Sequence, residues 1–174
     1  STEVSTSTPP PVIVTAINGN VFIRRGPDLG FNPVSVLMEG HSATALGRDV
    51  LAEWLQVPLP GNESKNGWVS IQSPFTSVAG DNLTLPEIPP SYFPVPASLR
   101  NCTLHQMLIT PGNIALPSVS SFPANDVQVN PGIYVIHDTD IDGYPGVLKV
   151  EVSEGSMIDI RVDGSGDKRK CPVP

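Results

Sequence analysis

Short apolar runs separated by turn residues follow one another along the first half of the chain. The runs are rich in β-branched side chains and end at glycine, proline, asparagine or aspartate. They read VIVTAI, VFI, VSVLM, WLQV and WVSI, at residues 12–17, 21–23, 34–38, 54–57 and 68–71. Runs this short predict β-strands joined by tight turns.

The second half continues the pattern with LHQMLI, VQV, IYVI, VLKVEV and MIDIRV, at residues 104–109, 127–129, 133–136, 147–152 and 157–162. Two turns lie between adjacent runs, Asn130-Pro131-Gly132 and the stretch around Gly155, and each predicts a β-hairpin. Apolar positions alternate with charged ones in the last two runs. The sequence therefore predicts an antiparallel sheet with one buried face and one solvated face, the latter bearing Lys149, Glu151, Asp159 and Arg161.

A proline-rich segment separates the two halves. Residues 85–96 read LPEIPPSYFPVP, with five prolines in twelve positions, which is typical of an extended linker or an edge strand. We therefore predict four regions. They are a disordered stretch over 1–11, a first domain over 12–85, a linker over 86–96 and a second domain over 97–174.

One segment has a different local preference. Residues 47–57, GRDVLAEWLQV, contain good helix formers with apolar residues at helical spacing. Intrinsic propensity alone favours a short helix here.

The motifs of the first half, taken together, indicate a family. They are VTAINGNVFIRRGP, PVSVLMEGHSATALGRD, EWLQV and NGWVSI, at residues 14–27, 33–49, 53–57 and 66–71. In order and spacing they resemble the bacterial SH3 domain over residues 12–88. The sequence departs from the family pattern at Phe22, where asparagine is usual, at Arg25, where serine is usual, and in a longer hairpin before Gly67.

The resemblance implies an SH3-like small barrel in the first half. With the alternating runs of the second half, we expect an all-β chain in which this barrel is followed by a second antiparallel β-sandwich-like domain. The resemblance also implies strand, not helix, over residues 47–57. Within the barrel, Gly26 and Pro27 would shape the long loop after the second strand. Trp54 and Trp68 would bury large apolar surfaces.

In such barrels ligands are bound mainly by loop residues. The resemblance implies recognition of a cell-wall peptide or glycan, or of a partner protein. The candidates are Arg24, Arg25, Asp28, Phe31, Asn32 and Trp54. Phe31 has two interpretations, an aromatic platform for a ligand or a plug for the barrel end. Trp54 also has two interpretations, because it could either pack in the core or contact a ligand.

The composition and charge of the chain limit the classes of partner that it can bind. The 174 residues include 20 prolines, and the formal net charge is −7 with an isoelectric point near 4.7. Without a basic face the chain is not expected to bind nucleic acid. No apolar run is long enough to predict a membrane span. The Ser/Thr/Pro-rich start, residues 1–11, is typical of a tether, and we expect an extracytoplasmic protein, secreted or lipoprotein-anchored.

The two cysteines, Cys102 and Cys171, have two interpretations. A disulfide would close a long loop and indicate an oxidising compartment. Two buried thiols would instead fit a cytosolic protein. A zinc site combining both cysteines with His105 and His137 is a weaker alternative, because one C-x-x-H pair is its only spacing signal.

The sequence DTDIDG, residues 138–143, matches the start of a calcium loop. Position twelve of that loop is Lys149 instead of glutamate, which excludes an EF-hand. A β-loop calcium site using Asp138, Asp140 and Asp142 remains, and the alternative is a solvated acidic loop.

No catalytic motif is present. The three histidines are scattered, and the chain lacks a G-x-S-x-G elbow, a phosphate-binding glycine loop and an H-E-x-x-H zinc motif. We therefore expect a non-catalytic binding or targeting module for cell-wall peptidoglycan or a surface glycan. The alternatives are a cell-surface protein–protein interaction or structural protein, and an accessory region of a larger secreted enzyme.

Overall fold

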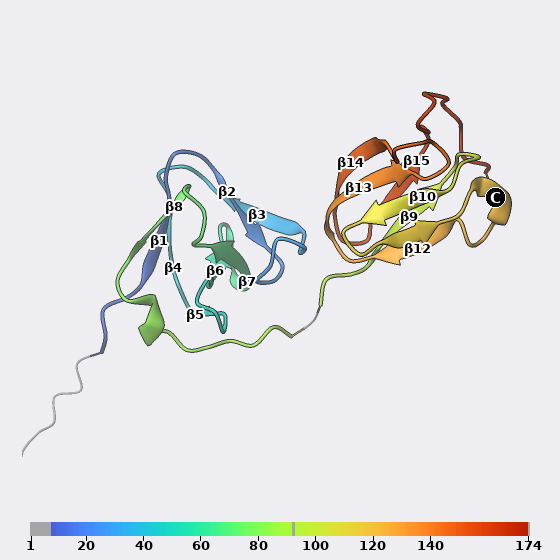
Figure 1. Ribbon diagram of the computed structural model, residues 1–174. Coiled ribbons are helices and arrows are strands. Elements are labelled where there is room, and N and C mark those ends of the chain that lie inside the picture. Colours follow the sequence, from blue (N-terminus) through green and yellow to red (C-terminus); the bar gives the residue numbers. More distant parts are fainter. Residues whose placement is uncertain (1–7, 92, 174) are drawn as a thin grey trace, which may run out of the picture. The chain divides into compact units, whose positions relative to one another are not determined.

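The protein is an all-β chain, as predicted. The computed structural model describes residues 8–91 and 93–173, which form fifteen strands and two short 3-10 helices. Within these residues no helix has the length and apolar character needed to cross a membrane. The chain divides into two compact units, one ending at Phe93 and the other starting at Pro94 (Figure 1). This division falls inside the proline-rich segment.

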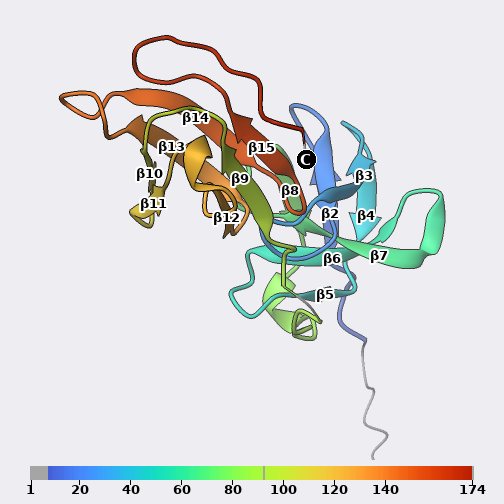
Figure 2. The same ribbon diagram turned by 90° about the vertical axis from the view of Figure 1, so that its right-hand side faces the viewer.

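The first unit contains two sheets (Figure 2). A three-stranded sheet has the order β4-β1-β8, and a five-stranded sheet has the order β3-β2-β7-β6-β5. The strands are β1 (Ile13–Ala16), β2 (Val21–Arg24), β3 (Pro33–Leu37), β4 (Ser42–Thr44), β5 (Gly47–Arg48), β6 (Trp54–Leu59), β7 (Asn62–Ser70) and β8 (Thr76–Ala79), followed by the 3-10 helix η1 (Asn82–Thr84).

Alternate residues of both sheets meet in one apolar core. Val14 and Ala16 from β1 are fully buried, as are Ile23 from β2, Leu55 from β6 and Val69 from β7. The period-2 pattern of the sequence therefore maps directly onto the inward face of each strand.

Residues 47–57 form β5, a turn and β6, so the helix favoured by propensity does not form. The cause is Asp49, whose buried carboxylate accepts hydrogen bonds from the backbone N–H groups of Leu51, Glu53 and Trp54. An aspartate that binds backbone amides a few residues ahead stabilises a turn in place of a helix.

β2 and β7 approach each other closely where Arg24 pairs with Trp68. Gly67 makes this approach possible, since a Cβ atom there would lie 2.4 Å from Cγ2 of Ile23 and 3.0 Å from the carbonyl oxygen of Arg24. Ile23 is fully buried and cannot move aside.

The start of the predicted linker belongs to the first unit. The N–H of Arg48 donates to the carbonyl of Pro86 at 3.0 Å, and the N–H of Ile88 donates to the carbonyl of Arg48 at 2.8 Å. The Ile88 side chain covers Gly47, where a Cβ would lie 2.2 Å from Cδ1 of Ile88. Residues 86–88 are thus an edge segment on β5, not linker.

The second unit also has two sheets around one core. The four-stranded sheet has the order β11-β10-β13-β14, and the three-stranded sheet has the order β12-β9-β15. The elements are β9 (Ala97–Asn101), β10 (Met107–Thr110), β11 (Ile114–Leu116), the 3-10 helix η2 (Val119–Ser121), β12 (Asp126–Val129), β13 (Gly132–Asp138), β14 (Gly146–Val152) and β15 (Met157–Ile160). Leu99, Ile109, Ile136 and Ile160 are among the fully buried core residues.

Both predicted hairpins of the second half are wrong. β12 pairs with β9, while β13 pairs with β10 and β14, so the turn at residues 130–132 crosses from one sheet to the other. The turn around Gly155 also crosses between the two sheets, since β14 and β15 belong to different sheets. A hairpin and a crossover between two sheets have the same alternation of apolar residues and the same turn residues in the sequence. The two can be distinguished only by which strands pair at long range.

The second unit is also not purely antiparallel, because β15 pairs with β9 in the parallel direction. The predicted solvated charges consequently lie on two different sheets. Lys149 and Glu151 are exposed on β14, and Asp159 on β15 forms ion pairs with Arg100 and Arg161, at 2.9 Å each.

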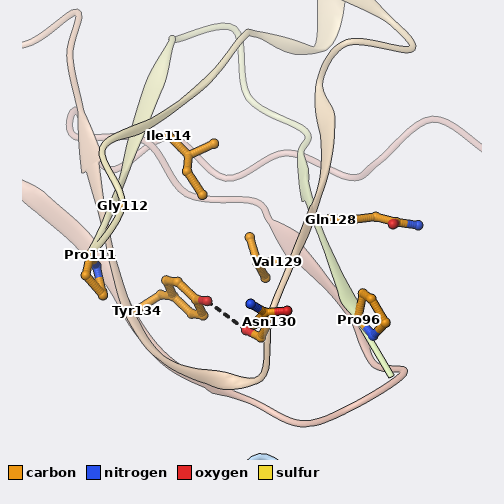
Figure 3. Close-up of a pocket in the computed structure, with 8 residues that line it drawn as sticks. All are labelled: Pro96, Pro111, Gly112, Ile114, Gln128, Val129, Asn130 and Tyr134. Carbon is orange, nitrogen blue, oxygen red and sulfur yellow. Dashed lines mark hydrogen bonds between the residues drawn. The ribbon is translucent and has the colours of Figure 1, made fainter. Parts of the chain in front are cut away.

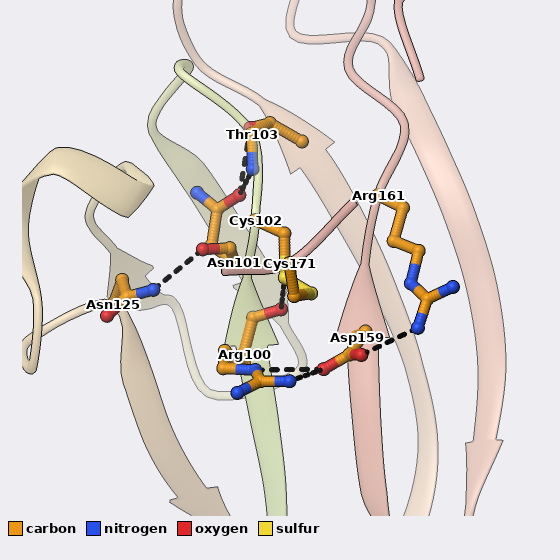
Figure 4. The surroundings of a disulfide bond; sticks show 8 residues. All are labelled: Arg100, Asn101, Cys102, Thr103, Asn125, Asp159, Arg161 and Cys171. Carbon is orange, nitrogen blue, oxygen red and sulfur yellow. Dashed lines mark hydrogen bonds and ion pairs between the residues drawn. A yellow bond between two sulfur atoms is a disulfide. The ribbon is translucent and has the colours of Figure 1, made fainter. Parts of the chain in front are cut away.

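The predicted disulfide is confirmed. Cys102 and Cys171 are bonded, 69 positions apart, with their Cα atoms separated by 4.8 Å. The bridge fastens the end of the described chain beside β9, next to the Arg100–Asp159–Arg161 ion pairs (Figure 4). Bonded cysteines offer no thiolate, so the zinc alternative is wrong. His137 lies elsewhere, with its Nε2 3.1 Å from Oγ1 of Thr110.

Replacing both cysteines by alanine should destabilise only the second unit, by about 4 kcal/mol on the chain-entropy relation for a loop of this length. Chemical denaturation of the full chain, followed by residue-resolved NMR in each unit, measures this. Equal loss of stability in both units, or no loss in either, would contradict the assignment.

Replacing Gly67 by alanine should lower the unfolding free energy of the first unit by about 1–3 kcal/mol, because the added methyl group forces β2 and β7 apart. The matched control is Gly146→Ala, where a Cβ would meet nothing closer than 3.5 Å. Unchanged stability of Gly67→Ala in urea titration would show that the strands do not meet there.

Candidate ligand-binding site

Arg24 organises the long loop after β2. Its Nη1 donates to the carbonyl oxygens of Leu29 at 3.2 Å and Phe31 at 2.8 Å. The guanidinium carbon also lies 5.9 Å from the centre of the Phe22 ring. The side chain is therefore held at the mouth of the loop, with its charge beside an aromatic face.

Phe31 is not an open platform. Its ring is only 3% exposed and packs on Gly26, where a Cβ would lie 2.4 Å from Cε2 of the ring. The guanidinium of Arg25 lies over the ring, 5.2 Å from its centre. Of the two interpretations, the structure has the buried one, in which the ring fills the loop from inside.

Asp28 and Asn32 also shape this loop. The Asp28 carboxylate accepts the N–H of Gly30 at 2.7 Å, and the Asn32 carbonyl accepts the N–H of Arg25 at 3.0 Å. Both interactions fold the loop back on itself, so these predicted ligand residues have a structural role in it.

Two of the predicted residues, Arg24 and Trp54, line the same cavity, which has a volume of about 180 Å³. Its exposed walls are Phe22 on β2, 56% exposed, and Phe75 in the turn before β8, 45% exposed. Leu29 borders it and is 71% exposed. We call Phe22, Arg24, Leu29, Trp54 and Phe75 the aromatic groove.

Each wall of the aromatic groove is fixed by backbone structure. Trp54 is nearly buried and starts β6, where its N–H is bound by Asp49 at 2.8 Å. Phe75 is held by its N–H bond to Oγ of Ser73, at 3.1 Å, and by its carbonyl, which accepts from the N–H of Ile17 at 2.8 Å. The groove is thus preformed.

Sequence reasoning missed Phe75 and Leu29 as site residues and noted Phe22 only as a departure from the family. One signal was available for Phe22. Its neighbours Val21 and Ile23 are core residues, so strand alternation places Phe22 on the outer face.

Two of the three predicted calcium ligands, Asp138 and Asp140, are brought together. Asp138 is fully buried at the end of β13, and its carboxylate accepts from Nδ1 of His105 at 2.7 Å, from the N–H of Gly164 at 2.6 Å and from the N–H of Asp140 at 2.9 Å. Asp142 is exposed and lies outside this group.

His105, Asp138 and Asp140 do form a compact set, with one possible ligand atom from each within 4.8 Å of the others. However, the buried carboxylate already has three donors, and Asp140 accepts the N–H of Gln106 at 2.9 Å. The acidic loop is therefore a hydrogen-bonded anchor for the segment around Gly164. Calcium binding stays a prediction, with Asp138 and Asp140 in one possible ligand group and Asp142 outside it.

Charge stabilises this anchor. The hydrogen bond to Asp138 raises the pKa of His105, against the opposing effect of burial. For Asp138, burial acts to raise the pKa, but the hydrogen bonds from His105, Gly164 and Asp140 outweigh it and leave the pKa below its ordinary value. The raised pKa of His105 and the lowered pKa of Asp138 both favour the charged pair.

Comparison with family models, with curated proteins and with solved structures finds no match to this chain.

The second unit should lose stability as the pH rises from the ordinary histidine pKa of 6.5 through the raised pKa of His105. The His105 contribution is complete below the ordinary histidine pKa of 6.5 and is lost as the pH passes the raised value. The contribution of Asp138 to stability has the opposite pH dependence, since it is lost only as the pH falls through a value below 3.8. Thermal unfolding at pH 6 to 9 measures the alkaline loss.

His105→Gln should cost about 1–3 kcal/mol at pH 6 and flatten this pH dependence. The control is His41→Gln in the first unit. A mutant that keeps the same pH profile as the unmodified chain would contradict the ion pair.

Proposed function

We propose that this protein is a non-catalytic binding module that acts outside the cytoplasm, and that the aromatic groove of an SH3-like first unit binds peptidoglycan. The observation behind the proposal is the pair of half-exposed rings, Phe22 and Phe75, on either side of a cavity that also holds Arg24 and Trp54. The SH3-like assignment rests on the order of the motifs and on the pairing of Arg24 with Trp68.

The chemistry of the groove favours a ligand with both apolar faces and negative charge. Exposed phenyl rings offer flat surfaces on which the C–H face of a sugar or an aliphatic side chain packs. The guanidinium of Arg24 can bind a carboxylate of the ligand. Both of its hydrogen bonds to the loop come from Nη1, so its other nitrogens can donate to that carboxylate. Peptidoglycan combines sugar rings with the carboxylates of its peptide stems.

The groove is better suited to binding than to catalysis. Its polar members besides Arg24 are Asn20, Ser70 and Ser73, and no carboxylate or imidazole lines it. Among the residues that line this cavity there is consequently no general base. We assign it recognition alone.

The disulfide is consistent with an oxidising location. We propose that the chain is exported, by secretion or through a lipid anchor, which would place the aromatic groove in the same compartment as the cell wall.

The test is co-sedimentation of the full chain with purified peptidoglycan sacculi. Phe22→Ala and Phe75→Ala should each weaken retention about tenfold, because each removes an exposed ring and leaves the core intact. Phe93→Ala and Phe122→Ala are matched controls, since both rings are highly exposed and lie outside the groove.

Unfolding midpoints equal to that of the unmodified chain would show that any loss is not caused by misfolding. Failure of the unmodified chain to sediment, or retention unchanged by both groove variants, would overturn the proposal. Capture of a surface protein that depends on Phe22 and Phe75, without wall binding, would replace it with the protein-partner alternative.

A further inference from the structure

The second unit contains a larger cavity that the proposed function does not use. Its volume is about 480 Å³, within the usual range for ligand clefts. It opens at one end of the unit, where the turn between β10 and β11 faces the connection from β12 to β13 (Figure 3). The two rims therefore come from different strands, and Pro96 before β9 completes the border.

Tyr134 is the fixed aromatic surface of this cavity. Its hydroxyl donates to the carbonyl oxygen of Asn130 at 2.7 Å, which ties the ring to the connection from β12 to β13 (Figure 3). A ring held at both ends loses little conformational entropy when a ligand stacks on it.

Apolar side chains form the floor. Ile114 and Val129 point into the cavity in Figure 3, and Val129 is buried. On the opposite rim, Gly112 and Asn113 have φ angles of +104° and +51°. This left-handed pair turns the chain sharply after Pro111 and keeps the rim narrow.

Among the described residues that line the cavity none has a charged side chain, although the chain as a whole carries a net charge of −7. Besides Tyr134, the amide of Asn130 faces the cavity and offers both donors and an acceptor. The Gln128 side chain points away from the cavity in Figure 3, because it neighbours the inward-facing Val129 on β12. Such a lining gives an anionic or cationic ligand no counter-charge, but it matches a neutral ligand rich in hydroxyl groups.

We propose that this cavity binds a neutral oligosaccharide, with one sugar ring stacked on Tyr134 and a hydroxyl group hydrogen-bonded to the amide of Asn130. A purely aliphatic ligand fits less well, since this amide would lose water without compensation. The site is separate from the aromatic groove and differs from it in having no positive charge.

The test is NMR titration of the full, isotope-labelled chain with three probes. Chitotetraose and cellotetraose are neutral, and tetragalacturonate is an anionic sugar of the same length. At least one neutral probe should bind, shifting the amide signals of residues 111–114 and 128–134, and the anionic probe should bind at least tenfold more weakly. Absence of binding by both neutral probes at millimolar concentration, or preference for the anionic one, would overturn the proposal.

Variants locate the binding. Tyr134→Ala should weaken binding about tenfold or more, and Tyr134→Phe should weaken it less, because the ring remains and only the bond to Asn130 is lost. Tyr144→Ala, an exposed tyrosine of the same unit outside the cavity, is the control. Equal affinity of Tyr134→Ala and the unmodified chain would refute the site.

Phe22→Ala should leave binding of the neutral probe unchanged. Failure of this site and failure of the peptidoglycan proposal can therefore be told apart, since each depends on variants in a different unit.

Discussion

The close approach of β2 and β7 at Gly67 fixes the geometry of the first unit. Because no Cβ separates the strands, Ile23 packs directly against the β7 backbone and Arg24 pairs with Trp68. Phe22 and Arg24 on β2 are thereby set beside Ser70 on β7 and Trp54 on β6. The aromatic groove depends on this contact, since the β2–β7 pairing places Phe22 and Arg24 on β2 next to the β6–β7 pair that carries Trp54 and Ser70.

Local features were predictable from the sequence, and long-range partners were not. Short β-branched runs gave the strands, and the spacing of Cys102 and Cys171 was enough to favour the bridge. The connections at residues 130–132 and 153–156 carry good hairpin turns, but which strand each neighbour pairs with depends on contacts elsewhere in the core. The parallel pairing of β15 with β9 has no local signal at all.

The candidate site shows the same division. Arg24 and Trp54 were predicted as ligand residues and line one cavity, whereas Phe31 is buried by its own loop. A phenylalanine flanked by glycine and asparagine gives no sign of whether its loop folds over it. DTDIDG likewise has the spacing of a calcium loop, but His105, which holds the buried Asp138, lies 33 positions earlier in the chain.

The two units offer different chemistry, a cationic groove with exposed rings in the first and an uncharged cavity with one tethered tyrosine in the second. The most direct measurement of the central claim is a residue-resolved NMR titration of the full chain with a soluble, peptide-bearing peptidoglycan fragment. The account predicts shifts concentrated at residues 20–24, 29, 54 and 70–75. Shifts confined to other residues, or none at millimolar fragment, would contradict it.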